Sequence, residues 1–112
     1  MDIDKIVSMF YMPMLWSKVI GGISCFAMKN HLSTGGEANG YCVIPQGHPW
    51  HGKGYDEIPV NIHGGLTYAE MDGGEWVIGF DVNHHSDNRY DNTLEWTINE
   101  TKKLAQQVKE AM

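Results

Sequence analysis

Histidine and aspartate side chains in the middle of the chain are the groups whose types could do chemistry. His63 precedes a Gly-Gly pair, Asp81 closes an apolar run, and His84 follows three residues later. An imidazole that is oriented by a carboxylate can accept and donate a proton near neutral pH. His63, His84 and Asp81 are therefore the candidate catalytic residues. The chain contains no G-x-S-x-G segment, so a hydrolase built on them would activate water or a hydroxyl group of its substrate.

A metal site and a site that only binds are two other uses of these residues. His63, Asp81, His84 and Asp87 could together bind a divalent metal, but their spacing matches no recognised metal signature. We therefore expect no cofactor and keep the metal as the alternative. In a site without reaction, imidazole and carboxylate groups would hydrogen-bond to a base or ribose on which an aromatic ring stacks. The expected ligand-binding residues are His48, Trp50, Lys53, Tyr55, His63, Gly64, Gly65, Thr67, Asp81, His84 and Asp87.

The segment 60–87 must position most of these groups, and its pattern is typical of strands. Apolar and polar residues alternate between Gly-Gly pairs, which predicts an antiparallel meander with strands at 60–62, 66–71 and 75–83. Three-residue loops at 63–65 and 72–74 would pair Tyr68 with Ile78 and gather the apolar side chains on one face. The other face would be polar, with Ala69 and Gly79 at its centre. This register is expected to bring together His48, His63, Asp81, His84 and Asp87 at one edge of the sheet.

The segment 46–59 is rich in glycine and has no apolar periodicity, which predicts an irregular loop. Gly47, Gly52 and Lys53 match most of a phosphate-binding P-loop, but Gly54 stands where that motif needs Ser or Thr. Pro59 also prevents the helix whose N-terminus would hold the phosphate. The loop is therefore not a P-loop, although its glycine N–H groups and Lys53 could still contact a phosphate or a carbonyl group.

The rest of the chain supplies elements that would pack on this sheet. Residues 2–12 have helical spacing up to Pro13, residues 14–28 fit either a short helix or a strand after a Gly-Gly pair, and residues 40–45 fit a strand. Residues 93–112 form the clearest helix, with an apolar stripe of Leu94, Ile98, Thr101, Ala105, Val108 and Met112. We expect a single α+β domain, residues 1–112, in which an antiparallel β-meander of about three to four strands is packed by the C-terminal helix and an N-terminal helix.

The composition restricts the classes of partner. The formal charge is −6 and Arg89 is the single arginine, so duplex nucleic acid is not an expected partner. No apolar run is long enough to span a bilayer, and we expect no membrane contact and a cytoplasmic location. Cys25 and Cys42 lie in apolar surroundings, which indicates buried thiols. Apolar residues of the C-terminal helix and of residues 9–16 exceed what the sheet can cover, which predicts a homo-oligomer with helix contacts between copies.

Several short motifs between residues 40 and 87 resemble those of a family of small, uncharacterised phage and prophage proteins. They are Gly40-Tyr41, Gly47-His48-Pro49, Gly52 with Tyr55-Asp56, Val60 with residues 62–68, and Trp76 with Gly79-Phe80-Asp81, His84 and Asp87. The resemblance implies a phage setting, and therefore the cytoplasm of a host cell, but no activity.

By analogy with small phage proteins that counter bacterial immunity, we expect binding and sequestration of a small nucleotide-derived signal, such as a cyclic nucleotide or a cyclic ADP-ribose isomer. One alternative is a phosphodiesterase that cleaves such a ligand with the His and Asp residues named above. The other alternative is an inhibitor that binds a host protein.

Overall fold

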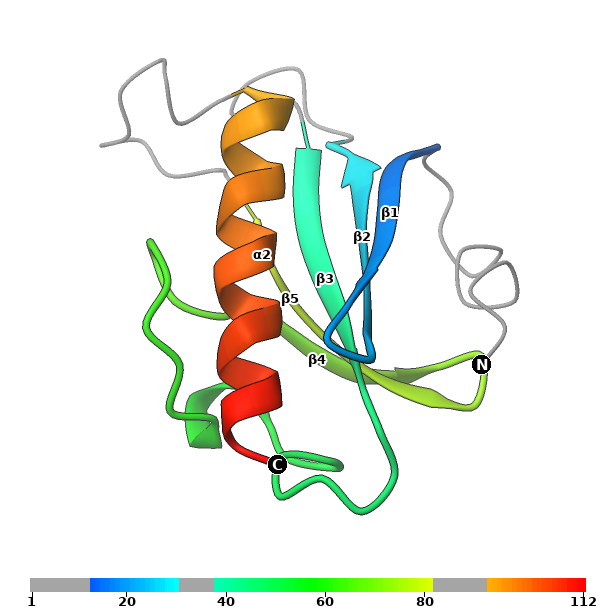
Figure 1. Cartoon of the computed structure of the whole chain (residues 1–112), viewed down its shortest axis with the longest axis vertical. Coiled ribbons are helices and arrows are strands. Elements are labelled where there is room, and N and C mark those ends of the chain that lie inside the picture. Colours follow the sequence, from blue (N-terminus) through cyan, green and yellow to red (C-terminus); the bar gives the residue numbers. More distant parts are fainter. Residues whose placement is uncertain (1–12, 31–37, 82–92) are drawn as a thin grey trace.

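The fold is one antiparallel sheet with a long helix on one face, which confirms the α+β class (Figure 1). The computed structural model describes residues 13–30, 38–81 and 93–112. The strands are β1 Met14–Ile20, β2 Ile23–Lys29, β3 Ala38–Ile44, β4 Tyr68–Asp72 and β5 Glu75–Phe80, in the order β1-β2-β3-β5-β4. A short 3-10 helix, η1 Tyr55–Glu57, lies between β3 and β4, and α2 Leu94–Glu110 follows the sheet. The five strands correct the prediction of about three to four.

Gly-Gly pairs make the tight turns of two hairpins. Gly21 and Gly22 join β1 to β2, and Gly73 and Gly74 join β4 to β5, each pair with φ near 57° and 85°. These values belong to a two-residue turn that side chains other than glycine rarely allow. The first hairpin decides between the alternatives for residues 14–28, which form two strands and no helix. The predicted strand at 40–45 is confirmed and begins earlier, at Ala38.

The predicted three-residue loop at 72–74 is wrong, and the register of the β4–β5 hairpin is therefore shifted by one residue. Tyr68 pairs with Gly79 and Ala69 pairs with Ile78. Since neighbouring side chains point to opposite faces, the shift moves Tyr68 off the helix-covered face and moves Ala69 onto it. Residues 60–62 are not a strand either. The predicted helix at 2–12 and the end of the strand predicted at 75–83 lie outside the described residues.

The core lies between the sheet and α2. Its fully buried side chains come from β2, β3, β5 and α2: Cys25, Cys42, Ile44, Ile78, Leu104, Ala105 and Val108. The helix predicted at 93–112 is confirmed, and Thr93 caps it by accepting a hydrogen bond from the N–H of Trp96 at 3.1 Å. The buried face is rotated slightly from the predicted stripe, because Thr97 and Leu104 are buried whereas Met112 is 69% exposed. No helix in the described ranges is long and apolar enough to cross a lipid bilayer.

Gly40 allows the helix to approach β3 closely. A Cβ on Gly40 would overlap the hydroxyl of Thr101 and lie 2.7 Å from the Phe80 ring. Thr97, one turn earlier on α2, donates a hydrogen bond to the carbonyl of Ala38 at 3.0 Å. These contacts fix the N-terminal half of α2 against the start of β3.

The sheet face turned away from α2 is apolar, so the predicted polar face is wrong. It carries a second buried cluster of Phe26, Met28, Tyr41, Val43 and Val77. The Tyr41 ring stacks on Phe26 with centroids 5.1 Å apart and meets Tyr68 edge-on at 5.6 Å. Tyr41 also lies across Gly79, where a Cβ would overlap its ring. The small residue at the centre of this face therefore accommodates an aromatic ring of the protein itself.

Candidate functional site

His48 is a buried residue that supports the fold. Its Nε2 lies 2.7 Å from the carbonyl oxygen of Val108, and its Nδ1 accepts the N–H of Trp50 at 2.9 Å. Since Nδ1 accepts, the donor of the ring is Nε2, which donates to the carbonyl of Val108. The carbonyl of Val108 lies in the last turn of α2. In a continuing helix it would accept the N–H of Met112, but that N–H bonds to the carbonyl of Lys109. His48 thus caps the C-terminal end of the helix, and both of its nitrogens are occupied.

The structure does not bring His48 and Asp81 together, so that part of the predicted convergence is wrong. Asp81 follows Phe80, which pairs with Gly40 near the start of β3, whereas His48 lies beyond the other end of that strand. The same separation is visible along α2, because Thr97 contacts the start of β3 and Val108 contacts His48. Thr97 and Val108 are eleven positions apart on the helix, which corresponds to about 16 Å.

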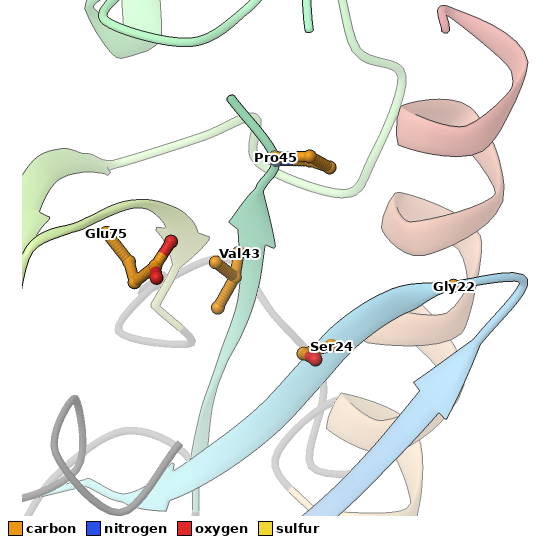
Figure 2. Close-up of a pocket in the computed structure, with 5 residues that line it drawn as sticks. All are labelled: Gly22, Ser24, Val43, Pro45 and Glu75. Carbon is orange, nitrogen blue, oxygen red and sulfur yellow. The ribbon is translucent and has the colours of Figure 1, made fainter. Parts of the chain in front are cut away.

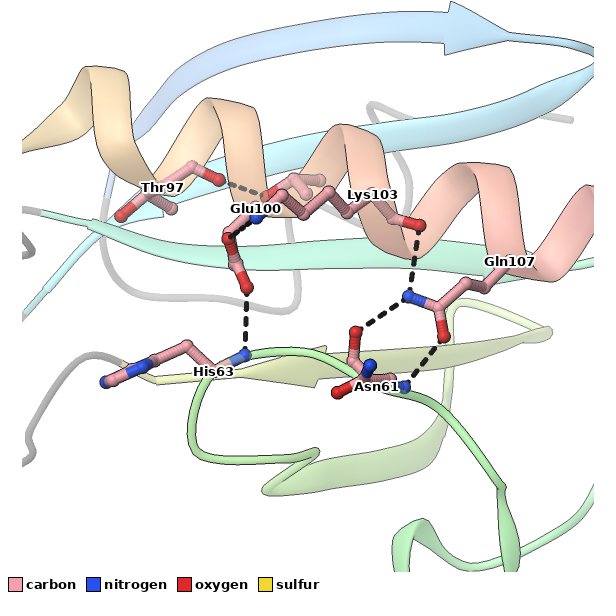
Figure 3. Close-up of polar contacts among 7 residues, drawn as sticks. Asn61, His63, Thr97, Glu100, Lys103 and Gln107 are labelled. Atoms are coloured by element: carbon pink, nitrogen blue, oxygen red, sulfur yellow. Dashed lines mark hydrogen bonds and ion pairs between the residues drawn. The ribbon is translucent and has the colours of Figure 1, made fainter.

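His63 lies on a loop that is attached to α2 by hydrogen bonds to its backbone (Figure 3). Gln107 accepts the N–H of Asn61 at 2.7 Å and donates to the carbonyl of Asn61 at 2.9 Å. Glu100 accepts the N–H of His63 at 2.8 Å and forms an ion pair with Lys103 at 3.2 Å. In Figure 3 the His63 ring points away from Asn61. The helix therefore holds the peptide groups of this loop and leaves the imidazole exposed.

The His63 ring is positioned further by Trp96 and by two glycines. The two rings meet edge to face with centroids 5.4 Å apart. Gly64 and Gly65 have φ of 76° and 73°, a conformation that other residues rarely adopt, and they turn the chain back toward the sheet. The predicted glycine-dependent turn at this position is thus present, although it does not join two strands.

Thr67 and Asp81 lie side by side where β4 and β5 meet this loop. The N–H of Thr67 donates to the carbonyl of Gly79 at 3.0 Å, and the N–H of Asp81 donates to the Thr67 hydroxyl at 3.1 Å. Burial raises the pKa of Tyr41 to about 12, and the negative charges of Asp81 and Asp72 contribute to this rise. Asp81 is therefore close enough to Tyr41 for its charge to act on the phenol. Thr67 is exposed and Asp81 is half-buried, so both can reach a ligand.

The other predicted site residues divide into two groups. Trp50 is buried in the core below α2, whereas Lys53 and Tyr55 are exposed on the loop that follows it. His84 and Asp87 lie outside the described residues. Within the part of the chain that is described, no three His, Cys, Asp or Glu residues are grouped as a metal would require.

Glu100, Gln107 and Trp96 are functional candidates that the sequence analysis missed. Glu100 gave a usable signal: it falls between Thr97 and Leu104 on the buried side of an amphipathic helix, where a charged residue needs a polar partner. That partner is the backbone of a loop far away in the sequence, which helical periodicity does not reveal.

A separate, shallow pocket of about 120 Å³ lies on the face of the sheet away from α2 (Figure 2). It is lined by Gly22, Ser24, Val43, Pro45 and Glu75. None of the predicted site residues lines it, and it lies at the β1–β2 turn, at the opposite end of β3 from Asp81.

Comparisons of the chain with protein-family models, with curated proteins and with solved structures found no match.

Proposed function

We propose that this protein binds and sequesters a small nucleotide-derived ligand at the end of the sheet where the 61–67 loop meets Asp81. The observation that carries the proposal is the attachment of this loop to α2. Three hydrogen bonds from Gln107 and Glu100 fix its backbone while the His63 side chain stays exposed. Fixing a loop before the ligand arrives lowers the entropy that binding must overcome.

The buried carboxylate of Glu100 supports a binding role for this loop. Glu100 is 5% exposed, and burying a carboxylate is costly unless hydrogen bonds and an opposite charge compensate for it. Here the compensation comes from the peptide N–H of His63 and from Lys103. An apolar residue at this position would stabilise the fold more simply, so the carboxylate is better explained by the placement of His63.

The side chains at the site suit the nucleoside part of such a ligand. The His63 imidazole and the Thr67 hydroxyl can donate or accept hydrogen bonds, and the Asp81 carboxylate can accept them from ribose hydroxyls or from a base. Trp96 adds an aromatic surface beside His63. The carboxylates of Asp81 and Glu100 make this end of the sheet unfavourable for phosphates, which we place farther from it. We also propose that the protein is of phage origin and acts in the host cytoplasm.

The test is to incubate the purified protein with cyclic dinucleotides and cyclic ADP-ribose isomers, heat it, and identify what it releases. Intact ligand in a stoichiometric amount supports sequestration. Linear products in excess of the protein indicate a phosphodiesterase instead, with His63 and Asp81 as the acid–base pair. If none of these ligands binds in a calorimetric titration, the proposal fails and inhibition of a host protein becomes the better hypothesis.

Two variants locate the site. Replacing a side chain that makes a buried polar contact costs about 1–3 kcal/mol, so His63→Ala should weaken binding roughly 10- to 100-fold. His51→Ala is the matched control, because His51 is half-buried beside Trp76 on a different loop. Equal losses in the two variants would contradict the location proposed here.

A further inference from the structure

The strand β1 forms one edge of the sheet, and no strand in the described ranges pairs with its outer side. Two of its apolar side chains are exposed, Leu15 by 42% and Val19 by 64%. A seven-residue edge strand that has exposed apolar side chains and no described strand on its outer side favours pairing with another strand. We infer that β1 pairs antiparallel with β1 of a second copy of this chain and forms a two-fold symmetric dimer.

The charge distribution selects this edge over the opposite one. The chain carries a net charge of −6, so two copies repel each other unless they meet where acidic residues are absent. β1 contains Lys18 and no acidic residue. At the other edge, antiparallel pairing of two copies of β4 about its midpoint would place Glu70 directly opposite Glu70 of the second copy, and like charges in that position are destabilising.

The sequence of β1 also selects a register. Side chains alternate between the two faces of a strand, and opposed side chains must lie on the same face. In a two-fold symmetric pair of β1 strands, one residue must therefore lie at the axis, directly opposite the same residue of the second copy. An axis at Lys18 would place two ammonium groups opposite each other. An axis at Ser17, the midpoint of the strand, avoids this and places Leu15, which lies where the β1–β2 register shifts between Met14 and Trp16, near Val19 of the second copy.

The same axis pairs Trp16 with Lys18 of the second copy. Trp16 is half-buried and packs at the rim of the core below α2, and Lys18 is exposed on the same face. An ammonium group near an indole ring is attractive, and the attraction strengthens as water is excluded. Each copy thus supplies both members of the Trp16–Lys18 pair, as an isologous interface requires. The dimer would be a continuous ten-stranded sheet with both copies of α2 on one face.

The experiment measures mass against concentration for the full-length protein, by light scattering and sedimentation velocity from the low micromolar range to hundreds of micromolar. The contact involves one strand from each copy, so we expect a reversible monomer–dimer equilibrium rather than a permanent dimer. Val19→Glu introduces a charge near Leu15 of the second copy and should raise the dissociation constant at least 10-fold. Met71→Glu is the matched control: Met71 is 53% exposed on β4, and this variant should dimerise like the original protein.

A cysteine placed on the two-fold axis tests the register directly. In the Ser17→Cys variant, two thiols from two copies face each other, at a Cα separation that a disulfide can span. Diamide should oxidise them to one intermolecular S–S bond, with both thiol protons and two electrons passing to diamide. Lys18→Cys should cross-link poorly, and Cys25 and Cys42 are fully buried. A monomer at every concentration, equal effects of Val19→Glu and Met71→Glu, or stronger cross-linking at position 18 would each overturn the inference.

Discussion

Replacing His48 by alanine tests whether this histidine supports the fold or binds the ligand. The substitution removes the donor to the Val108 carbonyl and the acceptor for the Trp50 N–H. It also removes an edge-to-face contact with the Trp50 ring, whose centroid lies 5.1 Å from that of His48. All three losses fall at the C-terminal end of α2, more than ten helical residues away from Thr97.

The structure sets the size of the effect. Each buried group left without a partner costs about 1–3 kcal/mol, and the ring contact contributes about 0.5–1.5 kcal/mol. Water that enters the space left by the ring restores part of the hydrogen bonding, so we expect a loss of about 3 kcal/mol in the free energy of unfolding. A domain of this size has a total stability of about 5–15 kcal/mol, so the variant should still fold, with a melting temperature about 10 °C lower.

The assay is thermal and urea unfolding followed by circular dichroism, with His51→Ala as the control. His51 lies three residues after His48 on the same loop and is half-buried, with its ring centroid 6.2 Å from that of Trp76. Its replacement should therefore lower the free energy of unfolding by less than about 1 kcal/mol. Ligand affinity at low temperature should not change in either variant. Unchanged stability in His48→Ala, or lost binding in a variant that remains stable, would refute the assignment of His48 to the fold.

Three other predictions concern the packing of the sheet. Gly40→Ala should lower stability by about 1–3 kcal/mol, measured by urea unfolding, because its Cβ would meet Thr101 and the Phe80 ring; a neutral effect would show that α2 can shift. Burial raises the pKa of Tyr41 to about 12, so stability should fall by about 2 kcal/mol as the pH rises from 10 to 12, and Tyr41→Phe should remove this component of a pH-dependent unfolding curve. Burial, followed by its contact with the other cysteine, raises the pKa of Cys42, so a disulfide reagent at pH 8 should modify it only as fast as the protein unfolds; rapid labelling of the native protein would contradict this.

Local patterns in the sequence predict the elements that are determined by neighbouring residues. The C-terminal helix follows from its apolar periodicity and from Thr93 as its cap, and β3 follows from a short apolar run that ends before Pro45. The irregular loop at 46–59 follows from its glycines and prolines, and it contains only the three-residue helix η1. In each case the signal and the structure that it produces lie within the same few residues.

The register of the hairpin could not be obtained in this way. The three-residue loop predicted at 72–74 collects the apolar side chains on one face, and this prediction assumes that the sheet has one core face. The sheet instead buries side chains on both faces, Ile78 below α2 and Val77 on the other side. A Gly-Gly pair is itself a strong signal for a two-residue turn, and the β4–β5 turn follows that local rule.

The histidines could not be sorted by type or spacing, because their roles depend on contacts with α2. The connection from β3 to β4 is attached to this helix at three places: His48 at Val108, Asn61 at Gln107 and His63 at Glu100. At the first place the imidazole itself makes the attachment, so the ring is occupied and buried. At the third place the peptide N–H makes it, so the ring is exposed. Which atom of a histidine bonds to the helix therefore separates the residue that holds the loop in place from the residue that the loop presents to a ligand.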